Sequence, residues 1–298
     1  MSKKGLPNQY ELDKISAGEY LKEFHEDVTN FVNCFLIPEG GIGASETTAL
    51  LLVSWFGITG KELNYLIDGG NDQLLKLIAN DIKANGGIIN LSTSVENITQ
   101  SNDQVTTYCS DGKVIKSDYV IVTTPAPVTK KIIFDLPKGK IDALSNVKYG
   151  KVIQVGLELK DFYPKKKLGS IIFHNENVNA YLSQTKKLKD GETYISINIT
   201  GDKVFDLDED TIVRHTVESL KKMQPEFDKT KHLKNWAIKK WENGIVVYNV
   251  GIMTKYQDDL RAPHNKIFFA GDYTHNPALD GAAWSGIRSV EQIKNKII

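Results

Sequence analysis

The strongest constraint on the fold lies near the carboxyl end of the chain, where a short apolar strand leads into a helix rich in small residues. The segment KIFFAGDYT (266–274) is followed by the loop HNPALDG and by GAAWSGIRSVEQI (281–293). The apolar run 267–270 is too short for a helix and is typical of a buried strand. Gly271 lets the backbone turn without a side chain. Asp272 then follows at the strand's carboxyl end, where ligands bind to open α/β sheets.

The residue types around this turn suit a polar, partly anionic ligand. The Asp272 carboxylate can accept hydrogen bonds from sugar hydroxyls. A helix beginning at Gly281, Ala282 and Ala283 presents unpaired N–H groups and the positive end of its dipole to an electron-rich oxygen. Gly286 lets the same helix pack closely on a sheet or a ring. The alternative is a buried strand packed on a helix, with a solvated aspartate in the loop.

A second segment, 67–100, predicts a helix that leads into a β-meander. Asn71 can cap the helix, and Gly86 and Gly87 end it. The strand-like runs IINLSTSVENI, QVTTYCSDG and KVIKSDYVIVTTP follow, with Asp111 and Gly112 as a hairpin turn. On its own, this order of elements occurs in many folds.

The two segments together resemble the flavin-containing amine oxidase superfamily, which includes amine oxidases, protoporphyrinogen oxidase and carotenoid-type desaturases. The resemblance covers nearly the whole chain and corresponds to the C-terminal two-thirds of such proteins. It implies noncovalent FAD as the cofactor. Asp272 would bind the ribityl chain, the amides of Ala282 and Ala283 would face the pyrimidine end of the flavin, and the Val95 backbone would contact the adenine. The other implied cofactor-binding residues are Gly271 and Pro125, the latter at the end of the T-x-P strand.

The resemblance implies an α/β (mixed α+β) fold: an incomplete Rossmann-like FAD-binding domain interleaved with a substrate domain of a mixed sheet plus helices. We expect the substrate domain at 1–60 and 138–260, and the FAD-binding domain at 61–137 and 261–298. Within the substrate domain, apolar spacing predicts packed helices over 19–35 and 49–58. Strands are predicted at 151–159, 169–174, 179–184, 193–201 and 231–241, with a helix after the acidic residues 208–210.

The first half of a FAD site is missing from the sequence. Proteins that bind FAD in this way begin with a strand, a GxGxxG turn and a helix. The glycine-rich stretch PEGGIGAS (38–45) lacks both the spacing and the preceding strand. We expect a split gene, in which a separate polypeptide supplies the GxGxxG half; a homo-oligomer, a truncated or decayed product and a fragment are the alternatives. The split arrangement predicts poor flavin retention by the chain alone.

The candidate catalytic residues are Gln154, Trp241, Tyr248 and His275. Gln154 stands where many amine oxidases place a lysine near flavin N5, and glutamine can hold a water but cannot act as a base. Ala278 replaces the aromatic residue that lies before the flavin helix, so a typical monoamine oxidase is not expected. Trp241 matches a recurrent family position and is expected beside the flavin with Tyr248, or else packed in the core. His275 is either a ligand contact or a simple hydrogen-bonding residue.

Composition excludes several other classes of protein. The chain of 298 residues has 37 basic and 37 acidic side chains, so nucleic acid is not an expected partner. Two distant cysteines, Cys34 and Cys109, imply neither a disulfide framework nor a metal site, and the six histidines show no paired ligand spacing. The start of the chain lacks an apolar signal core, and the apolar window 49–58 is half the length of a membrane span. We therefore expect a cytoplasmic protein.

Two functions follow from the sequence. The first is a FAD-dependent oxidoreductase that oxidises a C–N or C–C bond of a small molecule by hydride transfer to flavin, active only with its missing half. The second is a truncated, noncatalytic remnant or interaction subunit that does not hold FAD alone.

Overall fold

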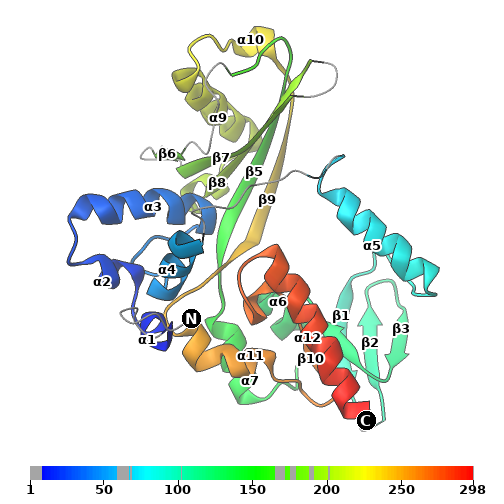
Figure 1. Ribbon diagram of the computed structural model, residues 1–298. Helices are drawn as coiled ribbons and strands as arrows, with labels where there is room; N and C mark the ends of the chain where they lie inside the picture. Colours follow the sequence, from blue (N-terminus) through cyan, green and yellow to red (C-terminus); the bar gives the residue numbers. More distant parts are fainter. Residues whose placement is uncertain are drawn as a thin grey trace.

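The computed structural model describes residues 9–58, 67, 69–101, 103–164, 172–174, 179–187, 191–200 and 202–297. The long strands of one sheet fill one end of the elongated molecule, and a smaller α/β layer forms the other end (Figure 1). Buried side chains form three clusters: one in the small layer, one under the long sheet and one among the first helices. The first cluster contains residues from both predicted domains, such as Ile132 and Phe269 beside Ala143 and Val246, so the domain limits stay a prediction.

The first elements of the described part of the chain are the helices α1 (Gln9–Asp13), α2 (Ala17–Leu21), α3 (Glu26–Gly40) and α4 (Ala49–Ile58). The helix expected over 49–58 is confirmed. The continuous helical packing expected over 19–35 is wrong, because the chain turns between α2 and α3, where the His25 side chain caps α3. The turn changes which face meets the core. Leu21 and Val32 are buried, whereas Phe24 and Phe31 are exposed.

Helix α5 (Asp72–Ala84) and an antiparallel meander follow, as expected from the second segment. The strands are β1 (Val95–Gln100), β2 (Val105–Cys109) and β3 (Val114–Ser117). Asn71 occupies the N-cap of α5 but makes no side-chain cap bond, and the first strand begins at Val95 instead of residue 88. The predicted hairpin is confirmed: Gly112 has a positive φ of 82°, and the Asp111 carboxylate accepts from the Lys113 N–H.

A two-stranded parallel sheet forms the centre of the small layer. Strand β4 (Val120–Val122) pairs in parallel with β10 (Ile267–Phe269). Around this sheet lie the helices α6 (Ala126–Ile132), α7 (Lys138–Asn146), α11 (Gln257–Arg261) and α12 (Leu279–Ile297). All three residues of β10 are buried, as expected for a strand covered on both faces.

The long sheet has the order β6-β7-β8-β5-β9 and consists of β5 (Lys148–Leu159), β6 (Ile172–His174), β7 (Asn179–Lys187), β8 (Thr193–Thr200) and β9 (Leu233–Val247). Every pair in it is antiparallel, so the mixed sheet predicted for this region is wrong. The segments joining β6 to β7 and β7 to β8 are too short for the crossover that parallel neighbours need. Residues 169–171 of the predicted strand 169–174 lie outside the described residues.

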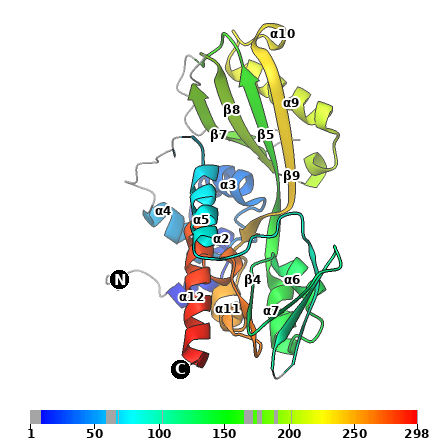
Figure 2. The ribbon, with the colours of Figure 1, turned by 90° about the vertical axis from the view of Figure 1, so that its right-hand side faces the viewer.

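Helices cover one face of the long sheet. Helix α9 (Glu209–Met223) begins with Asp208 as its cap, and α8 (Asp202–Phe205) and α10 (Lys229–His232) flank it. Helix α3 lies on the opposite side of the sheet from α9 (Figure 2). The inward residues of β5 and β8 pack on α9, while Gln154 and Asn198, opposite each other in the register, belong to the other face.

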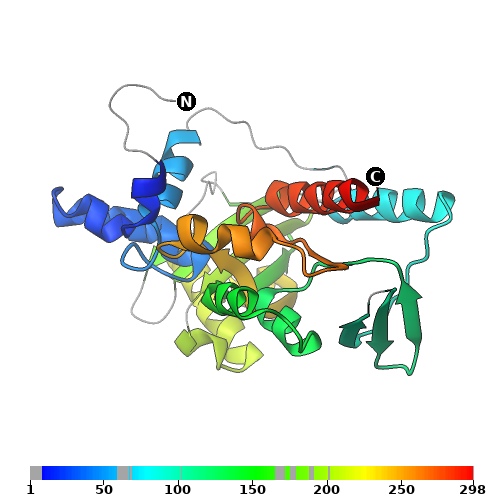
Figure 3. The ribbon, with the colours of Figure 1, turned by 90° about the horizontal axis from the view of Figure 1, so that it is seen from below.

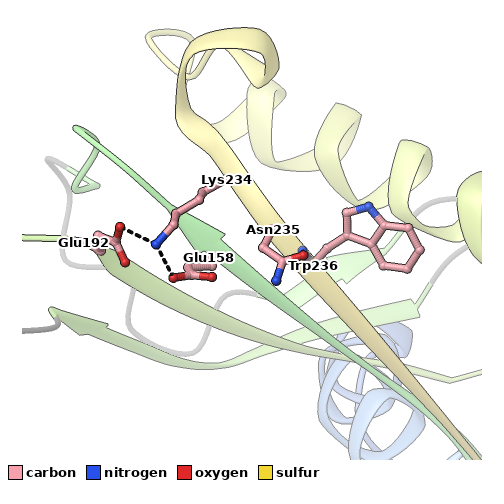
Figure 4. Close-up of polar contacts among 5 residues, drawn as sticks. All are labelled: Glu158, Glu192, Lys234, Asn235 and Trp236. Atoms are coloured by element: carbon pink, nitrogen blue, oxygen red, sulfur yellow. Dashed lines mark hydrogen bonds and ion pairs between the residues drawn. The ribbon is translucent and has the colours of Figure 1, made fainter.

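The far end of the long sheet carries a satisfied group of charges (Figure 4). The Lys234 ammonium on β9 donates to Glu158 Oε1 at 2.9 Å and to Glu192 Oε1 at 2.6 Å. Trp236, two residues further along β9, packs with the cluster under the sheet. These ion pairs link β9 to β5 and to the residue before β8, and they lie at a partially exposed position on the surface.

Two buried charged side chains tie distant segments together. The Asp13 carboxylate at the end of α1 accepts from Met253 N–H at 3.1 Å, from Thr254 N–H at 2.7 Å and from Thr254 Oγ1 at 2.8 Å, at the start of the π-helix η1 (Ile252–Tyr256). The Lys140 ammonium on α7 donates to the carbonyls of Leu260 and Ala262 at the end of α11.

None of the helices in the described ranges combines the length and the apolarity that crossing a bilayer requires.

Candidate functional site

The carboxyl ends of the two parallel strands bring two predicted ligand-binding turns together. In the register, Val122 lies opposite Phe269, and both strands run in the same direction. Pro125, which caps α6, and the Gly271–Asp272 turn therefore emerge at the same edge of the sheet. This is the edge at which ligands bind to parallel α/β sheets.

Asp272 has the geometry of a hydroxyl-binding carboxylate. One of its oxygens, Oδ1, accepts from the Tyr273 N–H at 2.9 Å, and this is its one side-chain hydrogen bond to the described residues. The side chain is partly exposed, and burial raises the pKa of its carboxyl group above the ordinary value. The second oxygen is available to a ligand, and hydrogen bonds from sugar hydroxyls would favour the ionised form.

Two arginines hold the turn that carries Asp272. The Thr274 carbonyl accepts from Arg261 Nε at 2.9 Å and from Arg288 Nη1 at 3.0 Å. Arg288 Nη2 also donates to the Phe269 carbonyl at 2.8 Å, so one guanidinium spans the end of β10 and the following 3-10 turn, η2 (Asp272–Thr274). Charge-assisted bonds of this kind make the position of the turn well defined.

The helix after this turn starts earlier than predicted. Helix α12 begins at Leu279 instead of Gly281, and the Ala282 N–H donates to the Ala278 carbonyl within the first turn. The N–H groups of 279–281 precede the first intrahelical bond and are the free donors of this end. Ala282 is partly exposed and Ala283 is exposed.

The small residues of α12 shape a surface that fits a flat ligand. Gly281, Ser285 and Ser289 are buried, and Ser285 Oγ accepts from the Gly271 N–H at 2.8 Å, which holds the helix against the strand turn. A Cβ on Gly281 would lie 1.7 Å from Asn276 Oδ1, so only glycine fits there. At Gly286, by contrast, an added Cβ would meet nothing within 4 Å. The open space at Gly286 leaves room for a flat ligand against this side of α12.

A cavity of about 270 Å³ lies between the first helices and the long sheet. Leu36, Ile42, Leu51 and Trp55 line it from the helical side, and Tyr248 lies on the opposite wall. The Thr48 N–H donates to the Tyr248 carbonyl at 2.8 Å, which attaches the start of α4 to the end of β9. The remaining lining residues are Thr47, Asn198, Ile245, Val246, Val247 and Pro277.

A second cavity, of about 410 Å³, adjoins the first and shares Asn198 and Ile245 with it. Gln154 and Trp241 line this second space. Trp241 is 50% exposed, so the alternative of a tryptophan packed in the core is wrong. A third space of about 270 Å³ lies beside Tyr149, Lys151 and Glu242.

Tyr248 connects the apolar cavity to the Asp272 loop. Its hydroxyl donates to the His275 carbonyl, and its ring lies on the cavity wall. Burial, to which the nearby Asp272 adds, raises the pKa of Tyr248 well above the usual range and keeps the hydroxyl neutral. The same two causes raise the pKa of Tyr149, whose hydroxyl accepts from the Ala126 N–H. His275 Nδ1 lies 3.2 Å from Asn276 Oδ1.

The predicted residues thus lie in two adjoining groups, and Val95 lies apart from both. Pro125, Gly271 and Asp272 share the strand ends with α12, while the cavity residues Gln154, Trp241 and Tyr248 lie towards the long sheet. Val95 starts β1 in the meander, with its side chain 37% exposed. In the described part of the chain, no group of three His, Cys, Asp or Glu residues could hold a metal ion.

Sequence reasoning missed several residues of the site. Tyr149 and Asn198 gave no motif, and Arg261 contacts the turn from a segment with no recognisable local pattern. Arg288 lies within the small-residue helix segment 281–293, but its side chain was not singled out there. The alternation along β8 could have assigned Asn198 to the face opposite the apolar residues. Tyr149 and the arginines have no such signal, because their contacts depend on the tertiary packing.

Comparison with known proteins decides the family. The sequence matches the family of flavin containing amine oxidoreductases over residues 8–294. The chain belongs to this family. Amine oxidase B of Cavia porcellus is 26% identical over 246 residues, which cover 77% of this chain and 47% of that protein. Amine oxidase A of Bos taurus is 24% identical over 261 residues, covering 81% and 49%.

Solved structures share the fold of this chain. Cyclohexylamine oxidase from Brevibacterium oxydans IH-35A superposes with a TM-score of 0.76 at 17% identity, over 98% of this chain and 70% of that one. Wild-type putrescine oxidase bound to putrescine gives a TM-score of 0.77 at 18% identity, with the same coverage. These findings confirm the α/β class, the amine oxidase resemblance, the oxidoreductase family and its flavin cofactor, FAD. The chain spans about half the length of the curated relatives it matches.

Proposed function

We propose that this protein is a FAD-dependent, amine oxidase-like oxidoreductase that oxidises a C–N or C–C bond of a small molecule by hydride transfer. The observation that carries the proposal is the position of the Asp272 turn, at a parallel strand end and joined through His275 and Tyr248 to an apolar cavity. When bound, FAD supplies the hydride acceptor. The named relatives act on amines, which favours a C–N bond in this chain as well.

The residues that would hold FAD are those at the strand ends. Asp272 offers a carboxylate oxygen for hydroxyl groups, and Gly271, with a φ of 140° and a Cβ position only 2.7 Å from the Tyr273 ring, lets the turn that carries Asp272 form. Pro125 contributes from the neighbouring strand end, and the first turn of α12 offers N–H groups and the positive end of its dipole to an electron-rich oxygen. The family resemblance proposes Ala283 and Val95 as backbone contacts of the cofactor. It also proposes Ala282, whose N–H already donates to the Ala278 carbonyl.

On the substrate side, the residues position the substrate and exclude water more than they transfer protons. Gln154 Nε2 lies 3.3 Å from Ser196 Oγ, so its amide is oriented, and it can hold a water but cannot act as a base. Tyr248 stays neutral and fixes the loop through the His275 carbonyl. Trp241 forms a wall of the second cavity.

Unpartnered apolar surfaces support the need for a further polypeptide segment. No residue of α5 is buried, although its apolar residues recur at helical spacing. Helix α12 runs in the same layer as α5 and exposes Trp284, Ile287 and Val290 (Figure 3). The exposed apolar residues of α5 are Leu74, Leu75, Leu77, Ile78 and Ile82. Exposed apolar side chains gathered on one helix mark interaction surfaces.

The parallel sheet also has an open edge on the same side of the site. The Val120 N–H donates to the Lys266 carbonyl, and the Ala270 N–H donates to the Val122 carbonyl. The backbone N–H and C=O groups of Ile121 therefore point away from β10, towards the open edge of β4. No other described strand pairs with this edge of β4. We propose that a polypeptide with the GxGxxG half adds its strand here and covers α5 and α12.

Co-expression of the chain with a polypeptide carrying a GxGxxG segment from a neighbouring gene tests this function. A yellow complex with the flavin absorbance bands, and oxidation of an added amine, would support it. A colourless complex would favour the alternative, a noncatalytic interaction subunit. Both cysteines in the structure, Cys34 and Cys109, are free thiols, which fits the cytoplasm as the proposed location.

A further inference from the structure

We propose that Lys140 is a positioning residue for the turn that carries Asp272, and that it acts on this turn through Arg261. The inference rests on the proposed function in one respect, because that function makes the turn part of the FAD site. Its basis is a series of contacts that leads from the buried ammonium on α7, through the end of α11, to η2.

The Lys140 ammonium binds the two carbonyls on either side of Arg261. It donates to the Leu260 carbonyl at 3.1 Å and to the Ala262 carbonyl at 2.6 Å. Helix α11 ends at Arg261, and the carbonyls at the end of a helix have no intrahelical partners. The ammonium supplies these partners and so fixes the backbone on both sides of the residue that carries the guanidinium.

The Arg261 guanidinium extends from this fixed backbone to the turn. Its Nε donates to the Thr274 carbonyl at 2.9 Å. The N–H and the hydroxyl of Thr274 both donate to the Gly271 carbonyl, and the His275 N–H donates to the Asp272 carbonyl. Asp272 therefore lies inside a closed turn, and Arg261 holds the last residue of that turn.

Lys140 also contacts the strand that leads into the turn. Its Nζ lies 4.0 Å from the centroid of the Phe269 ring, at the distance of a cation–π contact. Phe269 is the last residue of β10, and its carbonyl accepts from Arg288 and Ser289. One ammonium thus contacts both the strand before η2 and the helix end that holds η2.

Packing alone does not explain why this side chain carries a charge. Burial lowers the pKa of Lys140 to about 7, so the protein holds the ammonium at a cost in free energy. An apolar side chain of similar length would fill the same space without that cost. It would lack the two donors to the carbonyls beside Arg261, which are what the lysine adds.

A second lysine with the same kind of contact provides a matched control. Lys240 on β9 donates to the Phe205 carbonyl at 2.7 Å and to the Leu207 carbonyl at 2.6 Å, at the end of α8. Both of these residues pack against the cluster under the long sheet. Lys240→Met therefore removes an equivalent pair of bonds from another part of the molecule.

Amide hydrogen exchange of the full chain without cofactor, followed by NMR, tests the proposal. Lys140→Met should speed the exchange of the Thr274 and His275 amides at least about fivefold, because the turn opens more often. Lys240→Met should leave the same amides within about twofold of the wild type. Unchanged exchange of the turn in a folded Lys140→Met protein, or the same acceleration in both variants, would overturn the proposal.

Arg261→Met separates a positioning role from a general loss of stability. It should speed exchange of the turn amides at least as much as Lys140→Met does. Adding Lys140→Met to it should change the rates by less than about twofold, because the two residues act in one series. Additive effects, or wild-type exchange of the turn in Arg261→Met, would overturn the proposal, and the Arg261→Met result stands even where Lys140→Met does not fold.

FAD affinity in the complex gives the functional measurement. Lys140→Met should weaken FAD binding at least about threefold, and Lys240→Met should leave it unchanged. Equal affinities of the wild type and Lys140→Met would overturn the role of Lys140 in the cofactor site. Failure of the wild-type complex to bind FAD would leave the exchange rates measurable and would count only against the proposed function.

Discussion

Lys140 provides a test of how this fold holds a buried charge. Its side chain is 5% exposed, and the ammonium donates to the Leu260 carbonyl at 3.1 Å and to the Ala262 carbonyl at 2.6 Å. It also lies 4.0 Å from the centroid of the Phe269 ring, on β10. Burial lowers the pKa of Lys140 from 10.5 to about 7, while the nearby Asp259 carboxylate acts in the opposite direction.

The lowered pKa makes stability depend on pH in a defined direction. Between pH 7 and 10.5 the unfolded chain binds a proton that the folded chain has lost. The free energy of unfolding therefore rises with pH in this window, by about 1.4 kcal/mol per pH unit. From pH 7 to pH 9 the contribution amounts to about 2–3 kcal/mol. Below pH 7 both states are protonated, and the full cost of the buried charge is present.

Urea unfolding of the wild type and of Lys140→Met at pH 7, 8 and 9 measures this contribution. The variant lacks the titrating group, so the stability difference between the two proteins should change in favour of the wild type by about 1.4 kcal/mol per pH unit. Lys296→Met is the matched control, because it removes an exposed ammonium that donates to the Asn265 carbonyl. A difference that stays constant for Lys140→Met would refute the reasoning.

Four further substitutions test other contacts. Asp13→Ala leaves the donors of Met253 and Thr254 unpaired and should lower the free energy of unfolding by about 2–4 kcal/mol in urea melts, with Asp13→Asn losing less. Arg288→Met removes one of the two arginine donors to the Thr274 carbonyl and the guanidinium bond to the Phe269 carbonyl, and it should weaken FAD binding in an absorbance titration more than it lowers the melting temperature. Gly286→Val adds a side chain at a position where a Cβ would meet nothing within 4 Å, so calorimetry should show a folded protein. The absorbance titration should nevertheless show weaker FAD binding. Lys234→Met should hardly change the melting temperature, since its ion pairs are exposed.

The strongest local patterns predicted their elements well. The apolar run 267–270, the Asp111-Gly112 turn and the acidic start of α9 each depend on a few neighbouring residues, and the structure has the strand, hairpin and helix at those places. The helix after Asp272 was predicted two residues late. The glycine that suggested its start is in fact needed for close contact with Asn276.

The features that depend on distant partners were not predictable in the same way. Periodicity over 19–35 did not reveal the turn at His25, and the apolar spacing of α5 suggested packing that no described element provides. The short segments between β6, β7 and β8 already exclude parallel neighbours there, whereas the pairing of β5 with β8 and β9 joins segments that are distant in the sequence. The engagement of Thr274 by two arginines joins segments that are separated along the chain.

The central claim is that the Asp272 turn forms one part of a FAD site that another polypeptide segment completes. The measurement that tests it most directly is a titration of FAD into the chain, alone and with the GxGxxG-bearing polypeptide, followed by flavin absorbance. We predict stoichiometric binding in the complex, weak binding to the chain alone, and a loss of at least about tenfold in affinity for Asp272→Ala in the complex. Tight, stoichiometric binding by the chain alone, or unchanged affinity in Asp272→Ala, would contradict the account.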